Sequence, residues 1–293
     1  MTSTRTISIS TRTALGLVAP SLAVFALATL LPFIVLAWMS VHEMDLSQAG
    51  TQANFVGLHH YVELIGDERF RAAIWTTSGF VATGLAIETI AGCALGFILH
   101  SFSGAIRKLV STVVLIPMVI APVLVGLTWL FLLQPNYGLM AHILAFCGIE
   151  GTILSDPGRA LLVVRLVDVW EWTPFVGLVI AAALDAIPKT AREAAEVDGI
   201  NFRDRIRFLY WPATRRLLFL VMILRTIDTL KVFDSVYLLT GGGPGTSTEL
   251  ISLFIHRVAI GQTRIGYGAA ATVLLSYIVL GLTAIFYRQV KRV

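Results

Sequence analysis

The chain has 293 residues, of which 56% are hydrophobic and only 14% are charged, and its formal net charge is +4. A water-soluble domain usually carries about 25% charged residues, so the composition disfavours a soluble enzyme, a disordered chain and a nucleic-acid-binding domain. The two cysteines, Cys93 and Cys147, provide neither a disulfide framework nor the spacing of zinc ligands. One integral membrane domain is therefore the prediction.

Six apolar stretches are each long enough to cross a bilayer, which takes about 20 mostly apolar residues. They are Ala14–Ser40, Ala72–His100, Leu109–Leu133, Ala160–Ala186, Leu217–Thr240 and Ile265–Tyr287. None shows the alternation of apolar and polar residues that is typical of membrane β-strands. The first stretch is too long for the core of a signal peptide and lacks an obvious cleavage site. We therefore predict an all-α integral membrane protein with six transmembrane helices.

The basic residues indicate how these helices are oriented, because Lys and Arg are enriched in cytoplasmic loops. With the N-terminus inside, the cytoplasmic segments hold Arg5, Arg12, Arg107, Lys108, Lys189, Arg192, Arg203, Arg205, Arg207, Arg215, Arg216, Arg288, Lys291 and Arg292. The outside segments hold Arg69, Arg71, Arg159, Arg257 and Arg264. We therefore predict that both termini are cytoplasmic. The chain then has a tail over 1–13, a six-span transmembrane domain over 14–287 with a long cytoplasmic loop at 187–216, and a tail over 288–293. This bias explains the positive net charge without a nucleic acid.

The second stretch carries Gly84, Glu88, Gly92 and Gly96 at intervals of four residues, on one face of a helix. Small residues at this spacing let membrane helices approach closely. We predict that this is a packing face and that Glu88 bonds to a neighbouring helix, a structural role rather than a functional one.

Charged residues recur every third position in the fourth and fifth stretches. These are Arg165, Asp168 and Glu171, beside Trp172, and then Arg225, Asp228, Lys231 and Asp234. Ionisable residues in the hydrocarbon region are costly and often mark a pathway. Because the two helices run in opposite directions, the charges fall at similar depths and can face one water-filled cavity. We predict a pathway lined by Asp168, Glu171, Trp172, Lys231 and Asp234. The alternative is that Arg165 with Asp168, and Arg225 with Asp228, only hold the helices in register.

The cytoplasmic loop predicts two helical pieces, Lys189–Val197 and Phe202–Tyr210, joined at Gly199, which permits a sharp turn. Pro212 is expected to end the second piece. A short amphipathic helix of this kind lies on lipid or inserts into a groove of a protein. The mixed charge and the glycine turn favour a protein partner.

This loop resembles the EAA loop of binding-protein-dependent ABC importer permeases. Glu193, Ala194, Ala195, Gly199 and Pro212 match the family pattern, whereas Ile200 replaces its usual Ala and Trp211 its usual Leu. The resemblance implies that the loop docks in a groove of a separate ATPase. The docking residues would be Glu193, Ala194, Ala195, Asp198, Gly199, Ile200 and Phe202.

Three further segments resemble the carbohydrate permeases of the maltose-type family. Tyr237–Pro244 contains their Gly-Gly-Gly-Pro segment, Gly266–Ala270 resembles the opening of their last span, and Phe55–Tyr61 resembles their first outside loop, with His60 replacing Asn. The resemblance implies that Gly241, Gly242, Gly243 and Pro244 contact an external solute-binding protein. The glycine cluster lacks the Gly-Lys-Ser/Thr ending of a phosphate-binding loop, so nucleotide binding there is not expected.

Taken together, the resemblance implies a type I ABC importer permease of the bacterial inner membrane that forms half of a sugar pathway. The implied partners are a second permease subunit of different sequence, an ATPase dimer, an external solute-binding protein and the lipid bilayer. No catalytic residue, metal ligand or cofactor is expected in this chain, since ATP and Mg would bind the ATPase. The alternatives are an ABC permease for a non-sugar solute and an ion-coupled secondary transporter. Secondary transporters often contain inverted repeats, and none is visible here. An intramembrane enzyme is a further, weaker alternative.

Overall fold

The computed structural model describes residues 11–45, 53–149 and 151–290. Residues 1–10 and 291–293 of the two predicted tails lie outside this range. The chain divides into two compact units, one of residues 1–66 with 257–274 and one of residues 67–256 with 275–293.

The first unit brings together an early part of the chain and a late one. It contains α1 (Thr11–Ser40), the antiparallel pair β1 (His42–Glu43) and β2 (Asn54–Phe55), α2 (His59–Gly66), the π-helical η3 (Arg257–Gly261) and the start of α13 (Ile265–Val290).

Polar contacts join the segments of this first unit. Arg264 donates to the carboxylate of Glu63 at 2.8 Å, and the Thr263 hydroxyl donates to Asp45, also at 2.8 Å. At the start of α13, a Cβ on Gly266 would lie only 2.1 Å from the carbonyl oxygen of His42. The residues of the predicted small-residue opening are therefore small because another part of the backbone approaches them closely.

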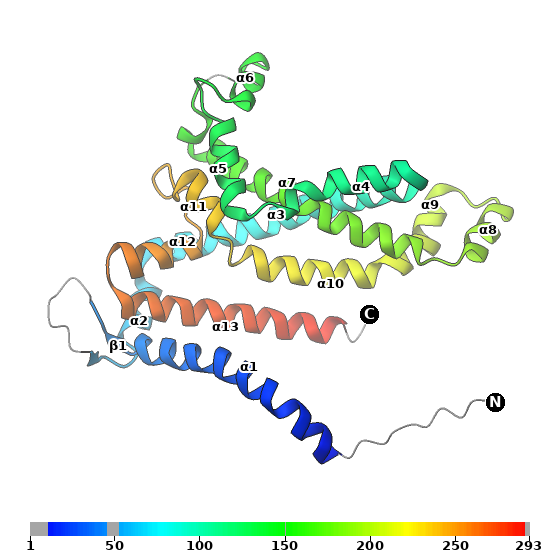
Figure 1. Cartoon of the computed structure of the whole chain (residues 1–293). Helices are drawn as coiled ribbons and strands as arrows, with labels where there is room; N and C mark the ends of the chain where they lie inside the picture. Colours follow the sequence, from blue (N-terminus) through cyan, green and yellow to red (C-terminus); the bar gives the residue numbers. More distant parts are fainter. Residues whose placement is uncertain (1–10, 46–52, 150, 291–293) are drawn as a thin grey trace. The chain divides into compact units, whose positions relative to one another are not determined.

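The second unit contains the remaining helices, in chain order. They are α3 (Glu68–Ser101), α4 (Gly104–Val119), α5 (Pro122–Leu132), α6 (Leu139–Phe146), the 3-10 helix η1 (Ile153–Ser155), α7 (Pro157–Asp185), α8 (Lys189–Val197), α9 (Phe202–Arg205), the π-helical η2 (Ile206–Tyr210), α10 (Trp211–Thr229), α11 (Asp234–Thr240), α12 (Ile251–His256) and the second half of α13. In Figure 1, α3 and α7 run side by side, and α8 and α9 lie at the end where α7 and α10 meet.

The contact between α3 and α7 depends on the predicted glycine face. A Cβ on Gly92 would lie 2.5 Å from Val176, and one on Gly96 would lie 2.6 Å from Ile180. Glycine thus lets the two backbones approach closely. Nothing lies within 4 Å of a Cβ built on Gly84, so the packing of these helices does not require glycine at this position.

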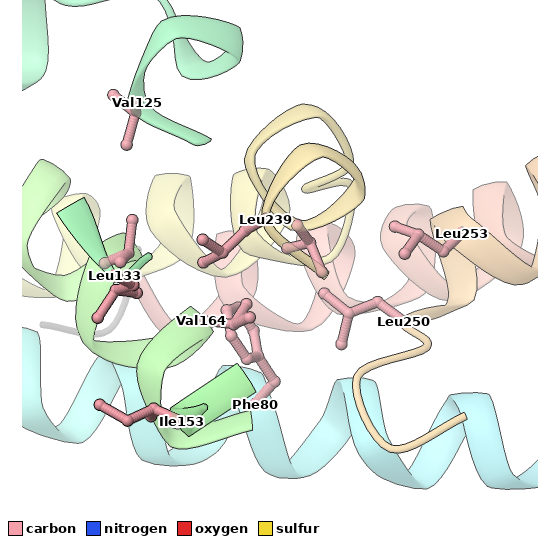
Figure 2. Packing of buried hydrophobic residues seen from close by; sticks show 10 residues of the cluster. Phe80, Val125, Leu133, Ile153, Val164, Leu239, Leu250 and Leu253 are labelled. Atoms are coloured by element: carbon pink, nitrogen blue, oxygen red, sulfur yellow. The ribbon is translucent and has the colours of Figure 1, made fainter. Parts of the chain in front are cut away.

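An apolar cluster fills the space between α3, α5, α7 and α11. Figure 2 shows Phe80 of α3 and Val164 of α7 beside Leu239 of α11, with Leu133 and Leu250 in the same cluster. Close packing of such side chains, rather than transfer out of water, stabilises contacts between membrane helices. The cluster holds α11 and the chain that follows it against the long helices.

Four helices are long and apolar enough to cross a membrane, and a bent pair makes a fifth candidate. The four are in α1, α3, α7 and α13. The third predicted span is α4 and α5, which meet at an angle of 94°. Pro122 explains the break: it disfavours a helical conformation of the preceding residue, and Ala121 is extended.

The prediction of one continuous helix over Leu217–Thr240 is wrong. The helix α10 ends at Thr229, and α11 begins only at Asp234. The connecting residues make short turns, in which the amide of Lys231 donates to the carbonyl of Asp228. The span was predicted from the apolar composition of the stretch alone, and composition does not indicate where a helix is interrupted.

Candidate functional site

The five residues predicted to line a pathway all line one cavity of about 310 Å³. Asp168, Glu171 and Trp172 come from α7, Lys231 from the α10–α11 connection, and Asp234 from the start of α11. The break between α10 and α11 turns the connecting residues toward α7. The structure thus brings the five residues to one cavity, and their role in a pathway stays a prediction.

Arg225 of α10 is the buried centre of this site. Its guanidinium donates to both carboxylate oxygens of Glu88, at 2.9 and 2.7 Å, and to Asp168 at 2.9 Å. All three side chains are at least 95% buried. Charge-assisted bonds of this kind compensate for the desolvation of buried ions only when the geometry is good. The predicted bond from Glu88 to a neighbouring helix is thus confirmed, and it joins α3, α7 and α10.

The alternative pairings expected from sequence spacing do not form. Arg225 hydrogen-bonds to Glu88 and Asp168 rather than to Asp228, and Asp228 lies 3.7 Å from Lys231. Within the described residues, Arg165 makes no ion pair and lies over the ring of Phe80. Arg225 therefore connects three different helices, whereas Lys231 pairs with Asp228, a neighbour three residues before it.

The remaining wall of the cavity mixes aromatic and polar groups. The Arg225 guanidinium lies 4.4 Å from the centre of the Trp172 ring, a cation–π contact. The other lining residues are Pro122, Asp228, Val232, Phe233 and Ser235. Sequence analysis did not place Pro122, Phe233 or Ser235 here. Pro122 begins α5 after the bend that follows α4, and Phe233 and Ser235 lie at the break between α10 and α11.

Within the loop 187–216, the first helical piece has the predicted bounds and the second begins where it was predicted. The piece Lys189–Val197 is α8, and α9 with η2 covers Phe202–Tyr210. Gly199 has φ +64°, its amide donates to Glu196, and the amide of Ile200 donates to Ala195. These two bonds form a Schellman motif, which needs a left-handed residue after the helix. Gly199 therefore fixes the angle between the two pieces.

Most of the predicted docking residues are accessible. Glu193, Ala194, Asp198 and Gly199 are exposed, Phe202 is 67% exposed, and Ile200 is partly buried. Ala195 is buried, so it holds α8 in position instead of contributing to the outer face. Val197 was not among the predicted docking residues, yet its side chain is 88% exposed on the same loop. The loop thus exposes two large apolar side chains, Val197 and Phe202, and two carboxylates, Glu193 and Asp198.

Pro212 does not end the second helical piece, so that prediction is wrong. The segments α9, η2 and α10 follow one another without a gap from Phe202 to Thr229, and Pro212 lies in the first turn of α10. Proline is tolerated at this point because the first turn does not need its missing N–H donor. The loop is therefore directly joined to the helix that carries Arg225.

The glycine-rich segment after α11 is held in a fixed conformation. Gly241 and Gly242 have positive φ angles, and the Thr248 hydroxyl donates to the carbonyl of Gly243 at 2.8 Å. Glu249, which is 1% exposed, accepts two hydrogen bonds from Arg69 at 2.7 and 3.1 Å. Gly241 is exposed, whereas Gly242 is buried and Gly243 and Pro244 are partly buried. Only part of the predicted contact segment is therefore accessible.

Residues 89–292 match the family model described as "Binding-protein-dependent transport system inner membrane component". The chain belongs to this family. It is therefore a permease subunit of a transport system, and it is a multi-pass membrane protein. The matched range includes the cavity on α7 and α10, the cytoplasmic loop and the glycine-rich segment.

Individual relatives are similar in sequence to the permease along nearly its whole length. It is 32% identical over 274 residues to the trehalose/maltose transport system permease protein MalF of Thermococcus litoralis, covering 93% of this chain and 91% of that protein. It is 31% identical over 284 residues to the sn-glycerol-3-phosphate transport system permease protein UgpA of Yersinia pestis, covering 94% and 93%.

A solved structure shares the fold of the permease. It is a bacterial ABC transporter involved in the import of the acidic polysaccharide alginate, with a TM-score of 0.82 at 22% identity. The likeness covers 96% of this chain and 95% of that chain. The fold is therefore that of an ABC importer permease, as the sequence predicted.

Proposed function

We propose that this permease forms half of the membrane pathway for a sugar or sugar derivative in an ATP-driven importer. The observation that carries the proposal is the cavity in which Asp168, Glu171, Trp172, Lys231 and Asp234 meet. Carboxylates and amines hydrogen-bond to sugar hydroxyls, and aromatic faces cover the apolar C–H surface of a sugar ring. Buried ionisable groups in membrane segments commonly mark such pathways. The sugar permease among the relatives supports this choice over a non-sugar solute.

We propose six transmembrane passages with both termini in the cytoplasm, in the bacterial inner membrane. Four candidate spans and the bent pair of α4 and α5 supply five of the passages, and α10 with α11 supplies the sixth as a broken span. The 14 basic residues on one side, against five on the other, support the orientation. The cytoplasmic loop and the glycine-rich segment then lie on opposite sides of the membrane.

The loop around Gly199 is the docking element for a separate ATPase. Its exposed residues include Glu193, Ala194 and Phe202, which offer an apolar surface with a carboxylate at its edge. A short helix of this kind fits into a groove of a protein partner. Because the loop continues into α10 without a gap, movement of the ATPase can pass along one helical track to Arg225 and the cavity.

The segment Gly241–Pro244 is the contact for an external solute-binding protein. The hydrogen bonds of Thr248 and Glu249 hold the segment next to α11, whose first residue lines the cavity. Docking of the binding protein can therefore bias the same helix that carries Asp234.

The transport cycle follows from these two contacts. ATP binding closes the ATPase dimer and moves the docking loop, and the cavity between this chain and a second, different permease opens outward to receive solute. Hydrolysis reverses the movement. ATP and Mg bind the ATPase, and this chain contributes no bond chemistry.

Purification of the tagged chain in mild detergent tests the proposal. We expect an ATPase and a second permease to co-purify with it, and the neighbouring binding protein to bind a saccharide. A chain that purifies alone and moves solute in vesicles without ATP would instead be a secondary transporter.

A further inference from the structure

The cavity has more negative than positive charge. Two cations, Arg225 and Lys231, face or border it, together with the five carboxylates Glu88, Asp168, Glu171, Asp228 and Asp234. With every group ionised the sum is two minus five, or −3. Protonation of two of the carboxyl groups still leaves it negative.

The cations are already engaged by carboxylates of the chain. Arg225 donates to Glu88 and Asp168, and Lys231 lies 3.7 Å from Asp228. Lys231 is 56% exposed, and the nearby Asp228 offsets its charge. Arg225 is only 1% exposed, so an acidic group of a solute would compete with its buried partners Glu88 and Asp168. Releasing a buried ion from its partner is costly, because it leaves an uncompensated charge in a medium of low dielectric constant.

Glu171 is a hydrogen-bond acceptor in the cavity wall that these pairs do not engage. Its side chain lines the cavity and is only 3% exposed, and it makes no hydrogen bond or ion pair within the described part of the chain. A buried carboxylate without a partner is unfavourable. A donor supplied by the solute, either a hydroxyl or an ammonium group, would satisfy it. An acidic group would be repelled by it.

We propose that the solute that passes this cavity is a saccharide without an acidic group, either neutral or amino-bearing. The inference rests on the proposed function and adds the charge class of the substrate. It separates this permease from two of its relatives, one named for sn-glycerol-3-phosphate and one for an acidic polysaccharide. Glu171 accepts a hydrogen bond from the solute, and Asp234, which is exposed at the cavity, adds to the exclusion of anions.

The test uses the complete complex with its binding protein, reconstituted in vesicles that contain ATP. The probes are labelled mono- and disaccharides of matched size in three forms: neutral, amino-bearing and uronic acid. We expect ATP-dependent uptake of a neutral or amino form, at least tenfold faster than that of its uronic acid counterpart. Comparable uptake of the acidic form would overturn the inference but leave the proposed function intact. Absence of ATP-dependent uptake for every probe would overturn the proposed function, and the inference with it.

Two variants assign the selectivity to this chain rather than to the binding protein. E171Q should raise KM for the transported saccharide about tenfold, and D234K should reduce the discrimination against the acidic form about tenfold. Asp234 is exposed, so D234K is expected to fold even if E171Q does not. The control is E68Q, because the Glu68 side chain is 94% exposed and distant in sequence from the cavity residues. Selectivity that is unchanged in D234K would overturn the inference.

Discussion

Arg225 of α10 and Glu88 of α3 form a two-pronged hydrogen-bonded ion pair, with N–O distances of 2.9 and 2.7 Å, in which neither side chain is more than 1% exposed. The same guanidinium also reaches Asp168 of α7. One cation thus fixes three helices at the depth of the cavity.

Loss of the cation should be more damaging than loss of one carboxylate. The variant R225M leaves Glu88 and Asp168 buried without their cation, and removal of one partner of a buried pair typically costs about 3–5 kcal/mol. E88Q keeps the Arg225–Asp168 pair, so we expect a smaller loss. The measurement is the Tm of the purified complex. An equal or larger loss for E88Q would show that Arg225 is not the centre of the network.

The close contact between α3 and α7 gives a second prediction. G92A and G96A place a Cβ about 2.5–2.7 Å from Val176 and Ile180. Overpacking of this kind costs about 1–3 kcal/mol, because the opposing atoms are close to the α7 backbone and have little freedom to move. Tm measurements should therefore fall for both variants. G84A is the matched control on the same face, and it should be neutral because nothing lies within 4 Å of the new Cβ. Equal effects at all three positions would contradict the account.

The docking surface gives a third prediction. F202D introduces a charge at an apolar residue that is 67% exposed, so it should leave the fold intact and weaken recovery of the ATPase by at least tenfold. Co-purification of the ATPase with the tagged permease measures this effect. The control is F146D, since Phe146 is 94% exposed on α6, away from the cytoplasmic loop in the sequence. If F202D retains the ATPase, the loop is not the contact.

A substitution at Gly199 tests whether the angle between the two helical pieces of that loop matters, because it changes the backbone and leaves the docking side chains unchanged. In G199A there is space for the methyl group, since nothing lies within 4 Å of it, but the positive φ angle becomes unfavourable by about 1 kcal/mol. We expect the complex to assemble and its ATP-dependent transport to fall severalfold. ATP hydrolysis and uptake measured on the same sample report this coupling. Unchanged coupling in G199A would mean that the angle between α8 and α9 does not matter.

The link between Arg69 and Glu249 gives a prediction for the outer side. R69M leaves the buried carboxylate of Glu249 without this partner and should loosen the glycine-rich segment. We expect weaker stimulation of ATP hydrolysis by the binding protein, while the basal hydrolysis of the complex persists. R71M is the control, because Arg71 is exposed and lies 3.9 Å from an exposed Glu68. Equal stimulation in R69M and R71M would exclude a role for this ion pair.

Local patterns predicted the loop and the cavity well. Helical periodicity and Gly199 gave the bounds of the first helical piece and the start of the second. Charges at every third position of two antiparallel stretches gave four of the lining residues, and the adjacent Trp172 is the fifth. The break between α10 and α11 was not predictable in the same way. Residues 230–233 contain neither proline nor glycine, and the carbonyl of Val232 accepts a hydrogen bond from the hydroxyl of Ser252, 20 residues away.

The ion-pair partners of Arg225 were also not predictable from the sequence. Spacing along one helix suggested that Arg225 pairs with Asp228, three residues away, but its partners lie 57 and 137 residues away. A single sequence does not show which of several buried carboxylates approaches a given cation. Ala195 was grouped with the docking surface because it matches the family motif, and the motif does not show which of its residues are buried.

We expect this permease to move a saccharide only when a docked ATPase hydrolyses ATP. The most direct test is uptake of a labelled saccharide by vesicles that contain the complete complex and its binding protein, with and without ATP on the side of the docking loop. We predict uptake with ATP, none with a non-hydrolysable analogue, and none with F202D. Uptake driven by an ion gradient in the absence of ATP would contradict the account.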